Sequence, residues 1–301
     1  MLIIFPVRNG EKSLNHISIK SYAKINLGLD VTGVLENGYH TVKMVMQNIS
    51  LYDSLYFEKR TSPKITLKTN LAYLPTNEKN IVYAAIQLFR EEFHISNGIY
   101  ANIVKKIPVA AGMAGGSGNA AATLKALDRL FGTKMSDEKL AELGLRLGAD
   151  VPYCLMGGTA LAEGIGEKLT RLPAPPQAKV LIVKPDISVS TQMVYKNLRL
   201  DDKTVHPDID ATIAAIKTGS LRDMCGTLGN VLEDVTVSLF PCIRDIKQRM
   251  LLDGAEGALM SGSGPTVFGL FSDEEAAVGA YNDFLSDNGT NSVFLCDFYE
   301  G

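Results

Sequence analysis

PVAAGMAGGSGN, residues Pro108 to Asn119, is the strongest break in the pattern of this 301-residue sequence. The chain continues as AAATLKALDRLFG, in which Ala120, Leu124 and Leu127 recur at helical spacing. A glycine-rich turn that opens a helix brings backbone N–H groups close to an anion, and the helix N-terminus adds unpaired donors and the positive end of a dipole. The stretch therefore predicts a phosphate-binding loop, with a structural glycine turn as the alternative.

Several known nucleotide loops can be compared with this stretch. The Walker type needs G-x-x-x-x-G-K-[ST], and the loop contains no lysine. Residues 116–118 with Ala121 fit the dinucleotide pattern G-x-G-x-x-A, but a proline opens the loop and no βαβ unit follows. A second glycine stretch, residues 262–264, precedes Pro265 and a strand, so it is suited to line a site rather than to open a helix. A non-enzymatic nucleotide- or dinucleotide-binding protein remains as an alternative.

The rest of the pattern predicts a mixed α+β chain in two halves. Residues 172–177, LPAPPQ, are the best linker. Before it we expect strands at 16–22, 23–34, 41–49, 54–58, 64–68 and 100–105, with helices at 80–93, 120–131 and from Ser136 to about Gly148. After it we expect helices at 207–218, 220–232, 241–252 and 273–285, with strands at 180–183, 257–260, 266–271 and 292–298.

Composition and charge exclude several classes of protein. Hydrophobic residues make up 46% and charged residues 21%, as in soluble globular proteins. The balance of 30 Lys+Arg against 33 Asp+Glu does not predict nucleic-acid binding, and no apolar run is long enough to span a membrane. The four cysteines include no C-x-x-C pair and the four histidines lack metal-ligand spacing. We expect a cytoplasmic protein with free thiols.

Three blocks of the sequence together resemble the GHMP small-molecule kinases. The loop that begins at Pro108 resembles the phosphate loop P-x-x-x-G-[LM]-x-G-S-[SA] of that family. Residues 23–27, AKINL, resemble its N-terminal signature, and residues 260–266, MSGSGPT, resemble its C-terminal glycine motif. The blocks occur in the family's order and at similar intervals.

The resemblance implies an α+β fold of two domains, an S5-like N-terminal domain and a ferredoxin-like C-terminal domain. We place these domains at 17–176 and 177–301, after an extension at 1–16 that has no counterpart in the family. It also implies ATP as co-substrate with Mg²⁺, although the metal ligands are not identified. The expected ATP-binding residues are Pro108, Val109, Ala110, Ala111, Gly112, Met113, Ala114, Gly115, Gly116, Ser117 and Gly118.

Two residues align with the catalytic pair of the family. Asp150 would accept the proton of, or orient, the attacking hydroxyl, and Lys24 would stabilise charge on the transferred phosphoryl group. The alternative for Asp150 is an ordinary helix N-cap before Pro152, and for Lys24 a solvated side chain on a strand. Strand alternation does not decide between the alternatives for Lys24.

Longer stretches resemble the members of the family that phosphorylate a cytidine-diphosphate alcohol in the non-mevalonate route to isoprenoids. These stretches begin SYAKINLGLDVTG, GLRLGADVPYCLM and KPDISVSTQMVY. The resemblance implies a cytidine-containing substrate held by Tyr39, His40 and Tyr195, with Thr191 nearby and Asn26 at the alcohol end. The alternatives are core packing for the aromatic residues, and a homoserine or mevalonate type of kinase for the chain.

Two positions depart from the family pattern. Gly118 stands where many members have a second loop serine, which leaves the role of that hydroxyl in doubt. Ser21 and Tyr22 precede Ala23 where the family often has a proline. Oligomeric state and regulation are not predicted.

Overall fold

Two long antiparallel strands, β1 (His16–Val34) and β2 (His40–Arg60), run through the centre of the molecule. They belong to a computed structural model that describes residues 14–36, 38–287 and 291–300. The sequence predicted two strands in place of β1. The predicted break coincides with a register shift between Tyr22 and Lys24, so a β-bulge takes the place of a strand end.

β2 was also predicted as two strands, with a break near Asp53. The strand is continuous there because residues 52–54 pair with β1 without a register shift. The buried Asp53 carboxylate accepts hydrogen bonds from the backbone N–H groups of Lys106 and Ile107 and from the side chain of Lys105. The turn between β1 and β2 contains Gly38 at φ 81°, while Asn37 lies outside the described residues.

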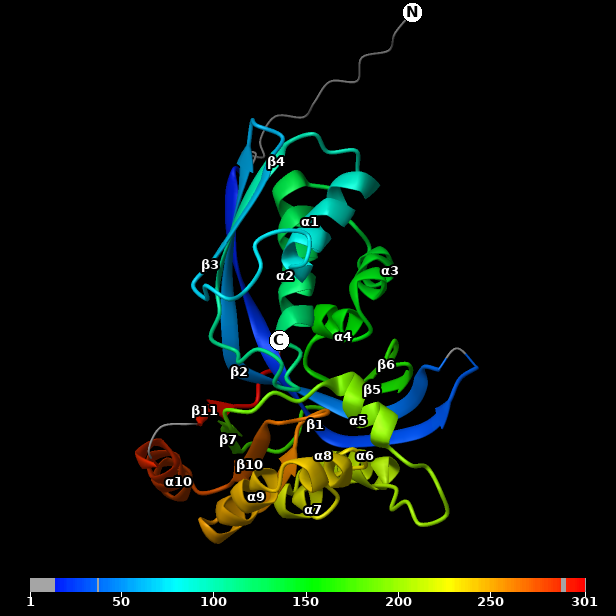
Figure 1. Cartoon of the computed structure of the whole chain (residues 1–301), viewed down its shortest axis with the longest axis vertical. Helices are drawn as coiled ribbons and strands as arrows, with labels where there is room; N and C mark the ends of the chain where they lie inside the picture. The colour runs from blue at the N-terminus through cyan, green and yellow to red at the C-terminus, as the bar shows by residue number, and fades with distance from the viewer. Residues whose placement is uncertain (1–13, 37, 288–290, 301) are drawn as a thin grey trace, which may run out of the picture.

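The larger sheet has the path β3-β4-β2-β1-β8, with β5 paired to β2 and β6 to β5. Helices cover one of its faces (Figure 1). The strands are β3 (Ile65–Thr69), β4 (Gly98–Val104), β5 (Thr159–Gly164), β6 (Lys168–Arg171) and β8 (Gly229–Asn230). The helices are α1 (Ile81–Glu92), α2 (Gly115–Phe131), α3 (Asp137–Leu147) and α4 (Val151–Met156).

The smaller sheet is antiparallel, in the order β11-β7-β10-β9, and helices pack on it in the lower half of Figure 1. Its strands are β7 (Lys179–Lys184), β9 (Gly257–Met260), β10 (Val267–Phe271) and β11 (Ser292–Asp297). The helices of this half are α5 (Thr191–Asn197), α6 (Ile209–Thr218), α7 (Leu221–Cys225), α8 (Glu233–Leu239), α9 (Cys242–Leu252) and α10 (Glu274–Ser286).

Side-chain caps begin several helices where the sequence predicts them. The Asn80 side chain accepts from the N–H of Val82, and the Ser136 side chain accepts from the N–H of Lys139. The helix expected at 220–232 is wrong in its second part: α7 ends at Cys225, β8 occupies residues 229–230, and α8 begins only at Glu233.

The two halves are joined by more than the linker. Residues 172–178, which lie between β6 and β7, contain no helix or strand. β8 of the second half pairs in parallel with β1, and Ile49 forms a bridge with Phe298. The α+β fold with two sheets is confirmed. The domain limits stay a prediction, and most of the extension at 1–16 lies outside the described residues.

The structure also bears on the cysteines and on membrane-spanning helices. All four cysteines are free, two of them buried and two partly buried. Within the described ranges, no helix is long and apolar enough to cross a membrane.

Candidate active site

The predicted phosphate loop joins β4 to α2 and ends in an open helix N-terminus. Ala110, Gly112 and Ala114 have positive φ angles of 51°, 71° and 53°, so the backbone reverses direction repeatedly before the helix. Ala114 occupies the N-cap position without a side-chain hydrogen bond, and the first turn of α2 has no acidic residue. Donors of this turn therefore remain available to an anionic ligand. All eleven predicted ATP-binding residues lie on this loop or in this turn.

Gly112 connects the phosphate loop to both halves of the molecule. Its carbonyl oxygen accepts hydrogen bonds from Lys24 Nζ and from Ser261 Oγ, each 3.0 Å long. A Cβ at Gly112 would lie 2.2 Å from the carbonyl oxygen of Ser261, so only glycine fits this contact. The C-terminal glycine motif therefore lies directly against the phosphate loop.

Lys24 is buried, with 5% of its surface exposed. Its Nζ also donates to Asn26 Oδ1 at 2.6 Å, and its backbone N–H donates to the Met113 carbonyl oxygen at 3.2 Å. Burial lowers the pKa of Lys24, and the negative charge of Asp150 opposes that shift. The alternative of a solvated side chain is wrong, and the structure brings Lys24 within electrostatic reach of Asp150.

Asp150 occupies the N-cap position of α4, but its side chain makes no capping hydrogen bond. Its charge contributes to the raised pKa values of three neighbours, Tyr153, Cys154 and Tyr195, although burial is the larger cause in each case. The pKa of Tyr195 is raised to about 12. Because the carboxylate is not used to cap the helix, it is available to a hydroxyl group of a substrate.

The residues predicted to hold the substrate come from both halves. The ring of His40, at the start of β2, lies 4.9 Å from the ring of Tyr195 in α5, at an interplanar angle of 53°. Tyr39 is 60% exposed beside His40. The Thr191 hydroxyl lies 2.8 Å from the Ser263 hydroxyl, which ties α5 to the C-terminal glycine motif. Asn26 is buried next to Lys24.

Sequence reasoning missed the residues that support these loops. Asn230 Nδ2 donates to the carbonyl oxygens of Met260 and Gly262, at 2.8 Å each, and thereby supports the C-terminal glycine motif. Asp53 holds the residues just before Pro108 through the hydrogen bonds described above. Neither residue has a local sequence signal, because their partners are 30 to 54 positions away in the chain.

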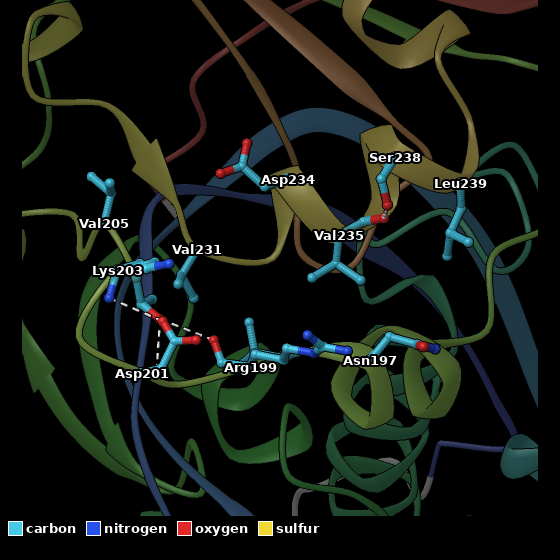
Figure 2. Close-up of a pocket in the computed structure, with 12 residues that line it drawn as sticks. Asn197, Arg199, Asp201, Lys203, Val205, Val231, Asp234, Val235, Ser238 and Leu239 are labelled. Atoms are coloured by element: carbon cyan, nitrogen blue, oxygen red, sulfur yellow. Dashed lines mark hydrogen bonds between the residues drawn. The ribbon is translucent and has the colours of Figure 1, made fainter.

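Two cavities lie away from the predicted site. Figure 2 shows a cavity of about 410 Å³ between the segment after α5 and helix α8, lined by Arg199, Lys203 and Asp234 among others. A second cavity of about 490 Å³ lies beside α9 and α10. Neither is lined by a residue predicted to bind ATP or substrate. The predicted site is instead the loop surface around Gly112 and Lys24.

Comparisons with known proteins agree with this geometry. The model "GHMP kinases N terminal domain" matches residues 80–158, and "GHMP kinases C terminal" matches residues 211–290. Curated proteins named 4-diphosphocytidyl-2-C-methyl-D-erythritol kinase are similar to the chain. The Lachnoclostridium phytofermentans protein is 55% identical, covering 94% of this chain and 98% of its own length. The Lachnospira eligens protein is 51% identical, covering 92% and 96%.

Solved structures show the same fold. The crystal structure of a 4-(cytidine 5'-diphospho)-2C-methyl-D-erythritol kinase superposes with a TM-score of 0.80 at 31% identity, covering 95% of this chain and 100% of that one. A homoserine kinase from Cytophaga hutchinsonii superposes with a TM-score of 0.79 at 22% identity, covering 96% of each chain, and supports the fold alone. The chain belongs to the GHMP kinase family and, within it, to the family of 4-diphosphocytidyl-2-C-methyl-D-erythritol kinases.

Proposed function

We propose that the chain transfers the γ-phosphoryl group of ATP to the 2-hydroxyl of 4-diphosphocytidyl-2-C-methyl-D-erythritol, giving the 2-phosphate and ADP. The reaction belongs to the non-mevalonate route to isoprenoid precursors. The observation that carries the proposal is the high identity, over almost the full chain, to proteins named for this activity. The loop, Lys24 and Asp150 supply the chemistry that such a transfer needs, and we expect it to take place in the cytoplasm.

Phosphoryl transfer depends mainly on positioning and on stabilising negative charge. The open N-terminus of α2 would bind the phosphates of ATP through backbone N–H groups. The buried ammonium of Lys24 would stabilise charge on the transferred group, and the Asp150 carboxylate would orient the attacking hydroxyl or accept its proton.

Mg²⁺ would accompany the phosphates of ATP. Mg²⁺ prefers oxygen ligands and is often held by one or two carboxylates together with substrate phosphates. The Ser117 hydroxyl, in the first turn of α2, and the Asp150 carboxylate are among the oxygen groups of this region that could hold it. When bound, the ion would neutralise part of the phosphate charge.

Several aromatic and polar groups support a cytidine substrate over an aliphatic alcohol. His40 and Tyr195 form one wall of the region, and Tyr39 is exposed beside them. Rings of this kind stack on a pyrimidine base, which homoserine and mevalonate lack. Thr191 and Asn26 add a hydroxyl and an amide group to the predicted substrate residues.

The test is a comparison of acceptors with Mg·ATP as the donor. We expect turnover with 4-diphosphocytidyl-2-C-methyl-D-erythritol and none with homoserine or mevalonate. Free CDP should inhibit competitively against the acceptor. Turnover with homoserine or mevalonate instead would overturn the substrate, and binding of NAD(H) without binding of ATP would overturn the class of protein.

A further inference from the structure

Gly118, in the first turn of α2, is pressed against strand β1. A Cβ on this residue would lie 2.6 Å from Ser21 Oγ and 3.4 Å from the carbonyl oxygen of Tyr22. The residue is helical and does not have a positive φ angle, so its backbone conformation does not require glycine. A side chain at position 118 would therefore require the Ser21 hydroxyl or the first turn of α2 to move.

Ser21 is an unusual neighbour for a helix terminus. Its side chain is 3% exposed, and its Oγ makes no hydrogen bond with any part of the chain that the structure describes. A buried hydroxyl without a partner costs free energy. Hydrogen bonding therefore does not explain why a serine stands here; the contact that the structure shows for its hydroxyl is the close approach to the position of a Cβ at residue 118.

We propose that Ser21 is a positioning residue for the ATP site, and this inference rests on the proposed function. Its hydroxyl occupies the space of the missing side chain at position 118 and thereby sets the separation between β1 and the phosphate-binding end of α2. Ser21 and Gly118 thus form a matched pair: a larger residue at one position requires a smaller residue at the other.

The separation matters because both sides of this contact carry groups of the site. Lys24 is three residues from Ser21 on β1, and its backbone N–H donates to the Met113 carbonyl oxygen of the loop at 3.2 Å. Ser117 is adjacent to Gly118 in the first turn of α2. A shift of that turn changes the position of its N–H donors relative to the Lys24 ammonium, and phosphoryl transfer is sensitive to such displacements.

The pairing is tested by moving the hydroxyl from one position to the other. The variants are Gly118→Ser, Ser21→Ala and the double variant, with Ser18→Ala as a control on the exposed part of β1. In Gly118→Ser we expect the KM for ATP to rise at least five-fold, with a smaller change in the KM for the acceptor and a lower Tm. In the double variant we expect the KM for ATP to return to within two-fold of the wild type, with recovery of the Tm.

Two results would overturn the inference. One is an unchanged KM for ATP in Gly118→Ser. The other is a double variant no better than Gly118→Ser, because Ser21 would then not be the group that excludes a side chain. If Gly118→Ser is insoluble, Gly118→Ala with and without Ser21→Ala gives the same comparison. Recovery of the Tm in the double variant reports the contact even if the wild-type protein fails to phosphorylate the proposed acceptor, which separates this inference from the proposed function.

Discussion

The carboxylate of Asp150 has a position that a capping residue would have, yet it does not cap α4. Replacement by asparagine keeps the size of the side chain and removes its charge and basicity. We therefore expect Asp150→Asn to lower kcat by about 10²–10⁴-fold, the range typical of a positioned acid or base, while the Kd for ATP changes by only a few-fold. Asp202→Asn, in an exposed loop, is the control. Near-wild-type turnover of Asp150→Asn would remove this residue from the mechanism.

The ammonium of Lys24 gives the reaction a pH dependence of defined sign. Burial lowers its pKa from the ordinary value of 10.5, so the side chain loses its charge at a lower pH than an exposed lysine. Since the charged form stabilises the transferred group in the proposed mechanism, we expect log kcat/KM to fall on the alkaline side below pH 10.5. In Lys24→Arg the guanidinium stays charged, and the remaining activity should lack this fall. The same alkaline limb in both proteins would assign it to another group.

Motifs of neighbouring residues point to Lys24 and Asp150 as candidate catalytic residues, but no motif predicted the burial of Lys24. The alternation of buried and exposed residues along a strand gave no answer for Lys24, because Ala23, Lys24 and Ile25 are all buried. At this point β1 is covered on one face by α2 and on the other by the second half of the chain. A pattern of alternate residues shows which face of a strand is buried only when the other face meets water.

At the scale of elements, the entry to the phosphate loop depends on β2. Asp53 is fully buried and accepts from the N–H groups of Lys106 and Ile107 at 2.7 and 2.9 Å, and it is paired with Lys105. Removing one partner of a buried ion pair leaves an uncompensated charge, which costs about 3–5 kcal/mol. We expect Asp53→Asn to lower the free energy of unfolding by about that amount and to raise the KM for ATP.

The control for this change removes both charges. Asp53→Asn with Lys105→Met leaves no unpaired ion in the interior, so much of the lost stability should return. Thermal unfolding and ATP kinetics measure the two effects separately. An Asp53→Asn variant as stable as the wild type, with an unchanged KM for ATP, would show that the backbone hydrogen bonds alone hold the entry to the loop.

Elements with a single strong local signal were the easiest to predict. Helices α1, α3 and α10 begin at side-chain caps and have an apolar face, and their predicted limits agree with the structure to within one or two residues. The short strands β5, β6 and β8 were missed. β5 and β8 depend on distant partners: β5 pairs with β2, and the two residues of β8 pair with Gly28 and Leu29 of β1. β6 is a four-residue strand that pairs with its neighbour β5. Pairing of this kind has no local pattern.

At the scale of the whole molecule, the candidate site lies where the two halves meet, and Asn230 supports the C-terminal glycine motif on one side of that contact. Its amide group donates to the carbonyl oxygens of Met260 and Gly262, and its Oδ1 accepts from the N–H of Leu232. Through Met260 and Gly262 it fixes the C-terminal glycine motif, whose Ser261 contacts Gly112 of the phosphate loop. The sequence showed both loops but not the residue that supports the second of them.

Asn230→Asp tests whether this contact between the halves is needed for catalysis. Aspartate has nearly the same shape but lacks the donor, so it would place a carboxylate against two carbonyl oxygens at a buried position. We expect a lower Tm, as for other buried groups left without partners, and a fall in kcat of at least ten-fold, because Gly112 and Lys24 lose their support. Asn197→Asp, in α5 on the surface, is the matched control. A variant with a lower Tm but full kcat at a temperature where it is folded would show that Asn230 stabilises the fold without positioning the catalytic lysine.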